Sequence, residues 1–164
     1  MKNKGLRYII QGGIIAAVYA ALTLITPIFS YGVGQVRISE ALCVLPFFTP
    51  AAIPGLFVGC ALANLGSPFG IIDIVCGSIA SLLAAYATSK VKNKWLAPLP
   101  SVLFNGLIVG LMLSTQIPGQ AWWAAILYVA GGQAIACYAL GMPLLFALDK
   151  FRGKLFGETR RKEE

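Results

Sequence analysis

The chain contains no histidine and little charge: only 12% of its 164 residues are Asp, Glu, Lys or Arg. A water-soluble domain carries about 25% charged residues, so this chain has too few to cover a globule of its size. The absence of histidine excludes Ser-His-Asp and Cys-His catalysis, and no GxxxxGK[ST] motif is present to bind a nucleotide phosphate. The four cysteines are far apart and form no CxxC pair, which argues against a disulfide framework or a zinc site. We therefore expect no enzyme activity, no metal and no cofactor.

The residues that are abundant favour a membrane protein. Apolar residues make up 58% of the chain, and the net charge of +7 is confined to short clusters, which excludes disorder and nucleic-acid binding. The uncharged stretches contain 29 residues between Arg7 and Arg37, 32 between Glu40 and Asp73, 16 between Asp73 and Lys90, and 54 between Lys94 and Asp149. A transmembrane helix needs about 20 mostly apolar residues, so these stretches are long enough for several spans.

The basic residues predict how many times the chain crosses the membrane. Twelve of the 13 Lys and Arg residues lie before residue 8, in the loop 90–94, or after residue 149. Basic loops remain in the cytoplasm, which requires an even number of crossings before and after the loop 90–94. We therefore predict an all-α integral membrane protein with one domain of six transmembrane helices and cytoplasmic N and C termini. The predicted spans are residues 8–29, 38–48, 51–66, 71–89, 97–115 and 122–148, followed by a basic cytoplasmic tail at 150–164.

Prolines interrupt the second predicted span. Pro46, Pro50 and Pro54 occur at every fourth residue, and each removes a backbone N–H and disfavours helix in the preceding residue. The second span is therefore predicted to be short. Two interpretations are open at this stage, because irregular backbone in a membrane can line a binding cavity or form a plain turn between helices.

Three charged residues lie apart from the basic clusters: Arg37, Glu40 and Asp73. An ionisable side chain in a span costs several kcal/mol unless it is paired or hydrated, so its default interpretation is functional. Arg37 and Glu40 are three residues apart and would share one face of a helix, where they can pair. The structural alternative is an interfacial salt bridge, with Asp73 as the cap of a helix N-terminus.

Uncharged polar residues extend this set. Asn64, Asn105 and Gln133 each offer a donor and an acceptor to the edge of a heterocycle, although such amides also hold membrane helices together. Tyr128 lies a turn inside the last predicted span, where its ring could stack on a ligand.

Two stripes of small residues run along the first predicted helix at intervals of four: Gly12, Ala16, Ala20 and Gly13, Ala17, Ala21. Such a stripe lets another helix approach closely, and dispersion contacts then drive association in lipid. We assign this doubled stripe to a separate subunit. The single stripes Gly55–Gly59 and Gly106–Gly110 are assigned to packing inside the chain.

The segment VRISEAL at 36–42, followed by LPFFTPAAIPGL at 45–56, resembles the QueT branch of the substrate-binding S components of energy-coupling factor (ECF) transporters. The likeness continues through Gly59, Asn64, the Asp73–Val75 segment and Gly77–Ser78. It implies a substrate-binding subunit in the cell membrane of a prokaryote that takes up a queuosine precursor, a 7-deazaguanine. It also implies docking on a membrane T component, driven by two cytoplasmic ATPases, through Ala16, Ala17, Ala20 and Ala21.

The implied ligand matches the polar residues of the spans. A 7-deazaguanine presents adjacent ring N–H and amine donors, which a carboxylate can accept, and a carbonyl that needs a donor. Either Glu40 or Asp73 suits the donors, and an aromatic residue suits the ring. The expected substrate-binding residues are Arg37, Glu40, Asn64, Asp73, Tyr128 and Gln133, with Phe47 and Phe69 as further ring contacts and a loop at 30–36 covering the pocket.

Three other functions stay open at this stage. The chain could be an S component for another vitamin or heterocycle, or a stand-alone secondary transporter with Glu40 and Asp73 as a proton-coupling pair. It could also be a membrane subunit without a transport role, whose polar residues only hold helices together. No inverted repeat is visible between the two halves, which argues against the secondary transporter.

Overall fold

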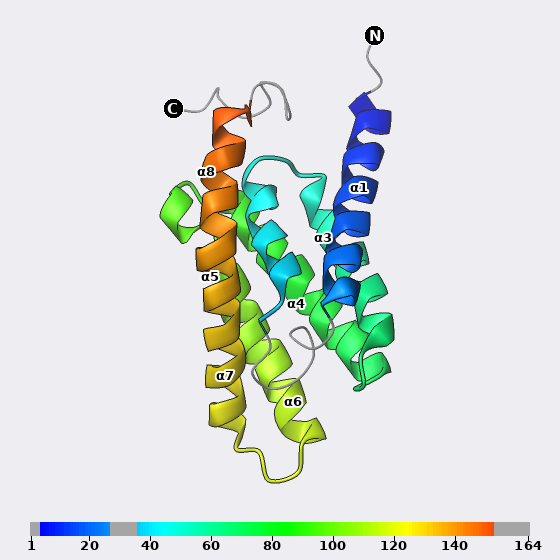
Figure 1. Cartoon of the computed structure of the whole chain (residues 1–164), viewed down its shortest axis with the longest axis vertical. Coiled ribbons are helices and arrows are strands. Elements are labelled where there is room, and N and C mark those ends of the chain that lie inside the picture. The colour runs from blue at the N-terminus through cyan, green and yellow to red at the C-terminus, as the bar shows by residue number, and fades with distance from the viewer. Residues whose placement is uncertain (1–3, 27–35, 153–164) are drawn as a thin grey trace.

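The computed structural model describes residues 4–26 and 36–152, which form a bundle of helices (Figure 1). No strand occurs within these ranges, so the all-α prediction is confirmed. The predicted covering loop at 30–36, apart from Val36, and the tail beyond residue 152 lie outside the described residues. The elements are α1 (Lys4–Ile25), η1 (Ile38–Phe47), α3 (Ala52–Ala63), η2 (Asn64–Gly66), α4 (Ile71–Lys90), η3 (Lys94–Leu96), α5 (Leu99–Phe104), η4 (Asn105–Val109), α6 (Gly110–Gln116), α7 (Trp122–Ala134), η5 (Ile135–Gly141) and α8 (Met142–Lys150).

Within the described residues, four helical segments are long and apolar enough to cross a membrane: Gly5–Ile25, Ile71–Lys90, Lys94–Gln116 and Trp122–Lys150. The third begins with η3 and a short turn and continues through α5, η4 and α6, and the fourth consists of α7, η5 and α8. The segments Ile38–Phe47 and Ala52–Gly66 are apolar but shorter. The chain thus fits a multi-pass membrane protein, while the count of six spans and the side of the termini stay predictions.

Large apolar side chains cover the outside of the bundle. Ile9 is 70% exposed, Ile71 76% and Leu127 64%. The interior, in contrast, holds 14 buried polar or charged side chains among the described residues. A surface of this kind suits lipid rather than water, and the polar interior must satisfy its hydrogen bonds within the protein.

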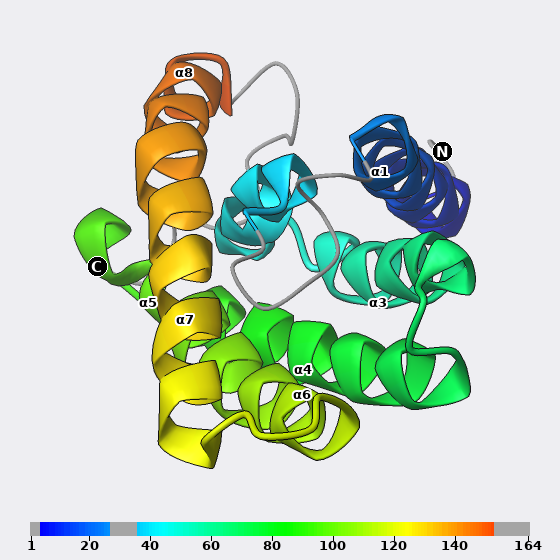
Figure 2. The ribbon, with the colours of Figure 1, turned by 60° about the horizontal axis from the view of Figure 1, so that its bottom comes forward.

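The short helix η1 occupies the middle of the bundle. Figure 2 shows it with α1 on one side and α8 on the other, and eight of its ten residues are buried. It is a 3₁₀ helix with Pro46 inside, and such helices rarely exceed four residues because their hydrogen bonds are poorly aligned. The prolines correctly indicate a short, irregular segment. Its position brings Arg37 and Glu40 to the centre of the protein.

Pro50 lies in the turn that leads from η1 into α3, and Pro54 lies just inside α3. The backbone N–H groups of Ala52 and Ile53 donate to the carbonyl oxygens of Thr49 and Pro50. Pro54 falls in the first turn of α3, where a missing N–H costs no helical hydrogen bond. The plain turn is therefore the correct interpretation for Pro50, whereas Pro54 belongs to the beginning of α3.

Glycines bring neighbouring helices into close contact. A Cβ atom at Gly55 of α3 would lie 2.8 Å from the carbonyl oxygen of Gly12 in α1. A Cβ atom at Gly110 would lie 2.7 Å from the Cα atom of Ile126 in α7. Only glycine fits such contacts, so the stripes Gly55–Gly59 and Gly106–Gly110 pack inside the chain, as predicted.

The first turn of α1 and the last turn of α8 lie at the same end of the bundle (Figure 1). The basic loop after α4 is at this end too, because the Nζ atom of Lys94 pairs with Oδ2 of Asp149 at 2.7 Å. The turn between α6 and α7 lies at the opposite end. This arrangement is compatible with a cytoplasmic location for the basic loop and both termini.

Candidate substrate-binding site

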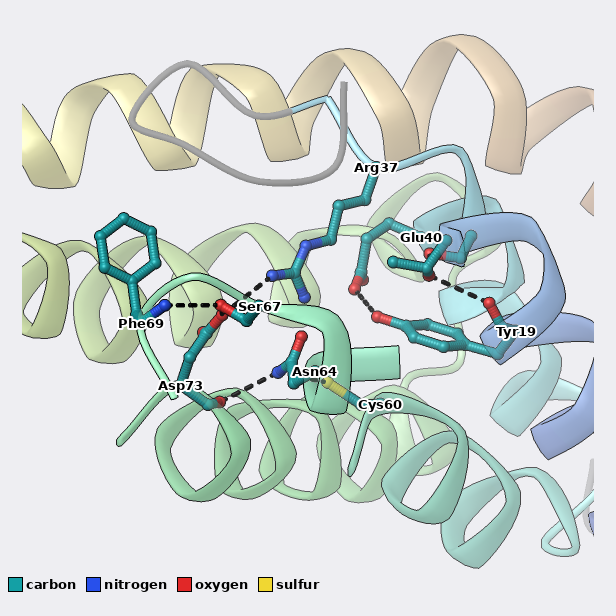
Figure 3. Close-up of polar contacts among 10 residues, drawn as sticks. Tyr19, Arg37, Glu40, Cys60, Asn64, Ser67, Phe69 and Asp73 are labelled. Carbon is teal, nitrogen blue, oxygen red and sulfur yellow. Dashed lines mark hydrogen bonds and ion pairs between the residues drawn. The ribbon is translucent and has the colours of Figure 1, made fainter. Parts of the chain in front are cut away.

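Buried charged and amide side chains gather around the beginning of η1 (Figure 3). Arg37 directly precedes η1 and is 5% exposed, and Glu40 in its first turn is 4% exposed. Asp73 in the first turn of α4 is 2% exposed, and Asn64 after α3 is fully buried. Charges buried at this depth require partners, and these partners form two clusters.

The Glu40 cluster consists of Tyr19, Glu40, Ser101, Asn105 and Gln133. The Tyr19 hydroxyl donates to Oε1 of Glu40. Gln133 Nε2 and Ser101 Oγ donate to Oε2 at 2.6 Å and 3.2 Å. Ser101 Oγ in turn accepts from Gln133 Nε2 at 2.9 Å and from Asn105 Nδ2 at 3.2 Å. Both oxygens of the carboxylate therefore have donors, and the network joins α1, η1, α5, η4 and α7.

The irregular helices meet at this same cluster. Both η4 and η5 are π-helical, a geometry that inserts an extra residue into a turn and is frequent at functional sites. Asn105 begins η4, and Cys137 in η5 directs its Sγ atom to the backbone oxygen of Glu40 at 3.6 Å. The irregular helices η1, η4 and η5 thus all place groups around Glu40.

The Asp73 cluster consists of Arg37, Asn64, Ser67 and Asp73. Oδ2 of Asp73 accepts a hydrogen bond from the Ser67 hydroxyl and lies 3.7 Å from Nη2 of Arg37. Asn64 Nδ2 donates to the backbone oxygen of Asp73 at 2.9 Å. The position of Asp73 in the first turn of α4 also favours its negative charge through the helix dipole. The alternative of Asp73 as the N-cap is wrong, because Gly70 occupies that position with a φ of 64°.

Two buried oxygens of the Asp73 cluster, Asp73 Oδ1 and Asn64 Oδ1, have no hydrogen-bond partner in the described part of the chain. The hydroxyls of Ser78 and Ser81, further along α4, also have no hydrogen-bond partner among the described residues. A buried polar atom without a partner costs about 1–3 kcal/mol. Such atoms therefore mark a place where a ligand or water can supply the missing hydrogen bonds.

A small cavity lies beside the Glu40 cluster and has room for about one water molecule. It is lined by Tyr19, Glu40, Cys43, Leu56, Ser81, Ala84, Ala85 and Ser101. Ser81 thus links the unpartnered groups of α4 to the Glu40 cluster. The cavity is too small for a heterocycle, so a ligand of that size needs space beyond it.

Comparison with known protein families bears on what these clusters do. The model of one family, described as QueT transporter, matches residues 9–150, a range that contains both clusters. The chain belongs to the QueT transporter family. No match is found among curated proteins or among solved structures. Membership of the QueT family supports a membrane transporter rather than an enzyme.

Five of the six residues predicted to bind substrate lie in the two clusters of this QueT family member: Arg37, Glu40, Asn64, Asp73 and Gln133. The structure does not bring Tyr128 to them, because this residue is 60% exposed on the outside of α7. Of the further ring contacts, Phe69 is half-buried and its backbone N–H donates to the Ser67 hydroxyl, while Phe47 is buried in an apolar core.

The sequence analysis missed Tyr19 and Ser101, which complete the Glu40 cluster. Tyr19 lies on the buried face of α1, three residues after Ala16 and four before Thr23. Two polar side chains on the small-residue face of a membrane helix are a usable signal for an internal contact. Ser101 carries no comparable signal, because its role depends on residues far away in the chain.

The two small-residue stripes of α1 have different environments. Ala16 is 6% exposed, and a Cβ atom at Gly59 of α3 would lie 2.9 Å from its carbonyl oxygen. Ala16 therefore belongs to the interface between α1 and α3, which corrects its assignment to a partner surface. Ala20 is half-buried. The exposed stripe consists of Gly13, Ala17 and Ala21.

Proposed function

We propose that this QueT family member is the substrate-capture (S) component of an ECF-type importer and binds a 7-deazaguanine queuosine precursor from outside the cell. The Asp73 cluster carries the proposal, because it combines a buried carboxylate, a buried guanidinium and acceptors without partners. A substrate that brings hydrogen-bond donors would satisfy these acceptors in a site from which water is excluded.

The charge of the two clusters favours a cationic ligand. The two clusters contain two buried carboxylates, those of Glu40 and Asp73, and one buried guanidinium, that of Arg37. With all three groups ionised, one negative charge is left in excess. A ligand with a positively charged substituent, such as an aminomethyl group on the base, would neutralise it, and an unpaired buried charge is costly.

The orientation proposed for transport places the basic loop 90–94 in the cytoplasm, together with both termini of a six-span protein. The Asp73 cluster, next to the turn between α3 and α4, would then lie toward the outer side. In this orientation the site receives substrate from outside.

The energy for transport is proposed to come from partner subunits, since the chain has no nucleotide-binding motif. The exposed stripe Gly13, Ala17 and Ala21 would dock on a membrane T component that is driven by two cytoplasmic ATPases. Replacing both Ala17 and Ala21 with Leu should abolish copurification with these subunits and leave ligand affinity unchanged. Ala139→Leu, at an exposed small residue of η5, is the matched control.

The proposed function is tested by calorimetric titration of the detergent-purified chain with 7-aminomethyl-7-deazaguanine. Binding of one ligand per chain without any partner is the expected result. Absence of binding would remove the substrate from the proposal. Steady uptake by the chain alone in vesicles, driven by a proton gradient, would instead assign a stand-alone secondary transporter.

A further inference from the structure

We propose that Asp73 Oδ1 and Asn64 Oδ1 together read the donor edge of the ligand, while the Glu40 carboxylate holds helices together and does not contact the base. This inference rests on the proposed function and deepens it, because it decides which of two buried carboxylates recognises the substrate. It depends on how the hydrogen bonds are distributed between the two clusters.

Both reading side chains are anchored through their other polar atom. Oδ2 of Asp73 is held by Ser67 and Arg37, which leaves Oδ1 for a ligand. Nδ2 of Asn64 is held by the backbone oxygen of Asp73 at 2.9 Å and by Cys60 Sγ at 3.6 Å, which leaves the amide oxygen. Each acceptor is thus oriented before a ligand arrives, which lowers the entropy cost of binding.

The backbone of α4 provides the space for the Asn64 amide. A Cβ atom at Gly77 would lie only 2.5 Å from Asn64 Nδ2, so glycine is required where the amide packs against α4. Figure 3 shows the Asn64 amide beside Asp73, with the Arg37 guanidinium above both in this view. The acceptor pair is therefore set by helix packing as well as by hydrogen bonds.

A pair of acceptors selects a ligand with two neighbouring N–H donors. The ring N–H and the exocyclic amine of a 7-deazaguanine form such an edge. An adenine-type edge places an acceptor where the second donor should be, and two acceptors would then face each other without a proton. Sites that bind a substrate donor in this way strongly reject analogues that lack it, because the buried acceptor stays unpaired.

Glu40 is not available for the same contact. Its Oε1 accepts from Tyr19, and its Oε2 accepts from Ser101 and Gln133. Three donors already surround this carboxylate, and the cavity beside it has room for only about one water molecule, so a ligand base could reach it only by rearranging these buried hydrogen bonds. The hydrogen bonds therefore assign Glu40 to the architecture of the bundle.

The test combines two ligands with three variants. Affinities are measured for 7-aminomethyl-7-deazaguanine and for the same compound without its 2-amino group, using the full chain in detergent. The wild type should lose tenfold or more when the amine is removed. In Asn64→Ala and Asp73→Asn the loss should be less than threefold, since the acceptor pair is already broken. Glu40→Gln should keep the tenfold preference although its unfolding temperature falls.

Each result has a distinct meaning. In one outcome, the wild type and the variants at Asn64 and Asp73 all keep the full preference for the ligand with the 2-amino group. That result overturns the assignment of the acceptor pair and leaves the proposed function intact. Loss of the preference in Glu40→Gln also overturns the assignment of the acceptor pair. A wild type that binds neither compound overturns both. Two variants are used so that misfolding of one, seen by size exclusion and circular dichroism, leaves the other to decide.

Discussion

The Glu40 cluster and the Asp73 cluster adjoin the same short helix and are equally buried, but they differ in how completely their hydrogen bonds are satisfied. Three donors from three other helical segments surround the Glu40 carboxylate. In the Asp73 cluster, one oxygen of the carboxylate and the oxygen of the neighbouring amide have no hydrogen-bond partner among residues 4–26 and 36–152. Burial alone therefore does not separate the two clusters, whereas their unsatisfied atoms do, and the proposed ligand site rests on that difference.

The two arrangements have opposite energetic consequences. Inside a protein the low dielectric strengthens a complete polar network and penalises an incomplete one. The Glu40 cluster should therefore stabilise the folded chain, and the Asp73 cluster should lower its stability until a ligand binds. A ligand that binds only the folded state raises stability further as its concentration exceeds the dissociation constant.

Removing the Glu40 side chain should have the largest effect on the stability of the protein. Glu40→Ala leaves the donors of Tyr19, Ser101 and Gln133 without their acceptor, and loss of one partner in a buried charged network costs about 3–5 kcal/mol. The free energy of unfolding in detergent measures this loss. Glu40→Gln, which keeps the shape and one acceptor oxygen, should lose less. A cost no larger than that of Asp73→Asn would contradict the distinction between the clusters.

Gly77→Ala should damage the Asp73 cluster through packing alone. The added methyl group would meet Asn64 Nδ2 at 2.5 Å and displace the amide, at a cost of about 1–3 kcal/mol and with a loss of ligand affinity. The control is Gly131→Ala on α7, where nothing lies within 4 Å of the added atom. That variant should be unchanged or up to about 1 kcal/mol more stable, because alanine favours helix over glycine. Equal stability of the two variants would show that the Asn64 amide is not confined by α4.

Two buried serines give a matched test of the hydrogen-bond argument. Ser101 is 1% exposed and hydrogen-bonded within the Glu40 cluster, whereas Ser78 is 4% exposed and its hydroxyl has no hydrogen-bond partner in the part of the chain that the structure describes. Ser101→Ala should cost about 1–2 kcal/mol, because it leaves bonded groups unsatisfied. Ser78→Ala should be neutral or stabilising in the ligand-free chain. Unfolding measurements that rank the two serines in the reverse order would refute the assignment of the unsatisfied region.

Most of the helical architecture follows from the sequence because a bilayer leaves few options. Long uncharged stretches must be helical, since no water satisfies the backbone within the membrane. The prolines correctly indicate a short segment at 38–48, but not that it is a central 3₁₀ helix. The close approach of α3 to α1, which buries Ala16, was not separable from a surface for another subunit, because small residues serve both contacts equally well.

The composition of the site was more predictable than its connections. The cost of placing polar groups in lipid singles out Arg37, Glu40, Asn64, Asp73 and Gln133, and all five are buried. Their role in substrate binding stays a prediction. The pairing of these residues could not be predicted, because Gln133 and Glu40 are 93 positions apart and no local pattern relates them. The π-helical segments η4 and η5 also shift the faces of their helices, so a period of 3.6 residues does not place every side chain correctly.

The smallest expected effect concerns Tyr128, the predicted ring contact that the structure leaves outside both clusters. It is 60% exposed on α7, so Tyr128→Ala should change the free energy of unfolding by less than about 0.5 kcal/mol and leave ligand affinity unchanged. Tyr19→Phe is the informative counterpart, because it removes one buried hydroxyl from the Glu40 carboxylate and should cost about 1.5–3 kcal/mol. A marked loss of affinity in Tyr128→Ala would mean that substrate binding turns this face of α7 inward. The Asp73 cluster would then be only part of the site, and the difference between a complete and an incomplete network would no longer locate the ligand.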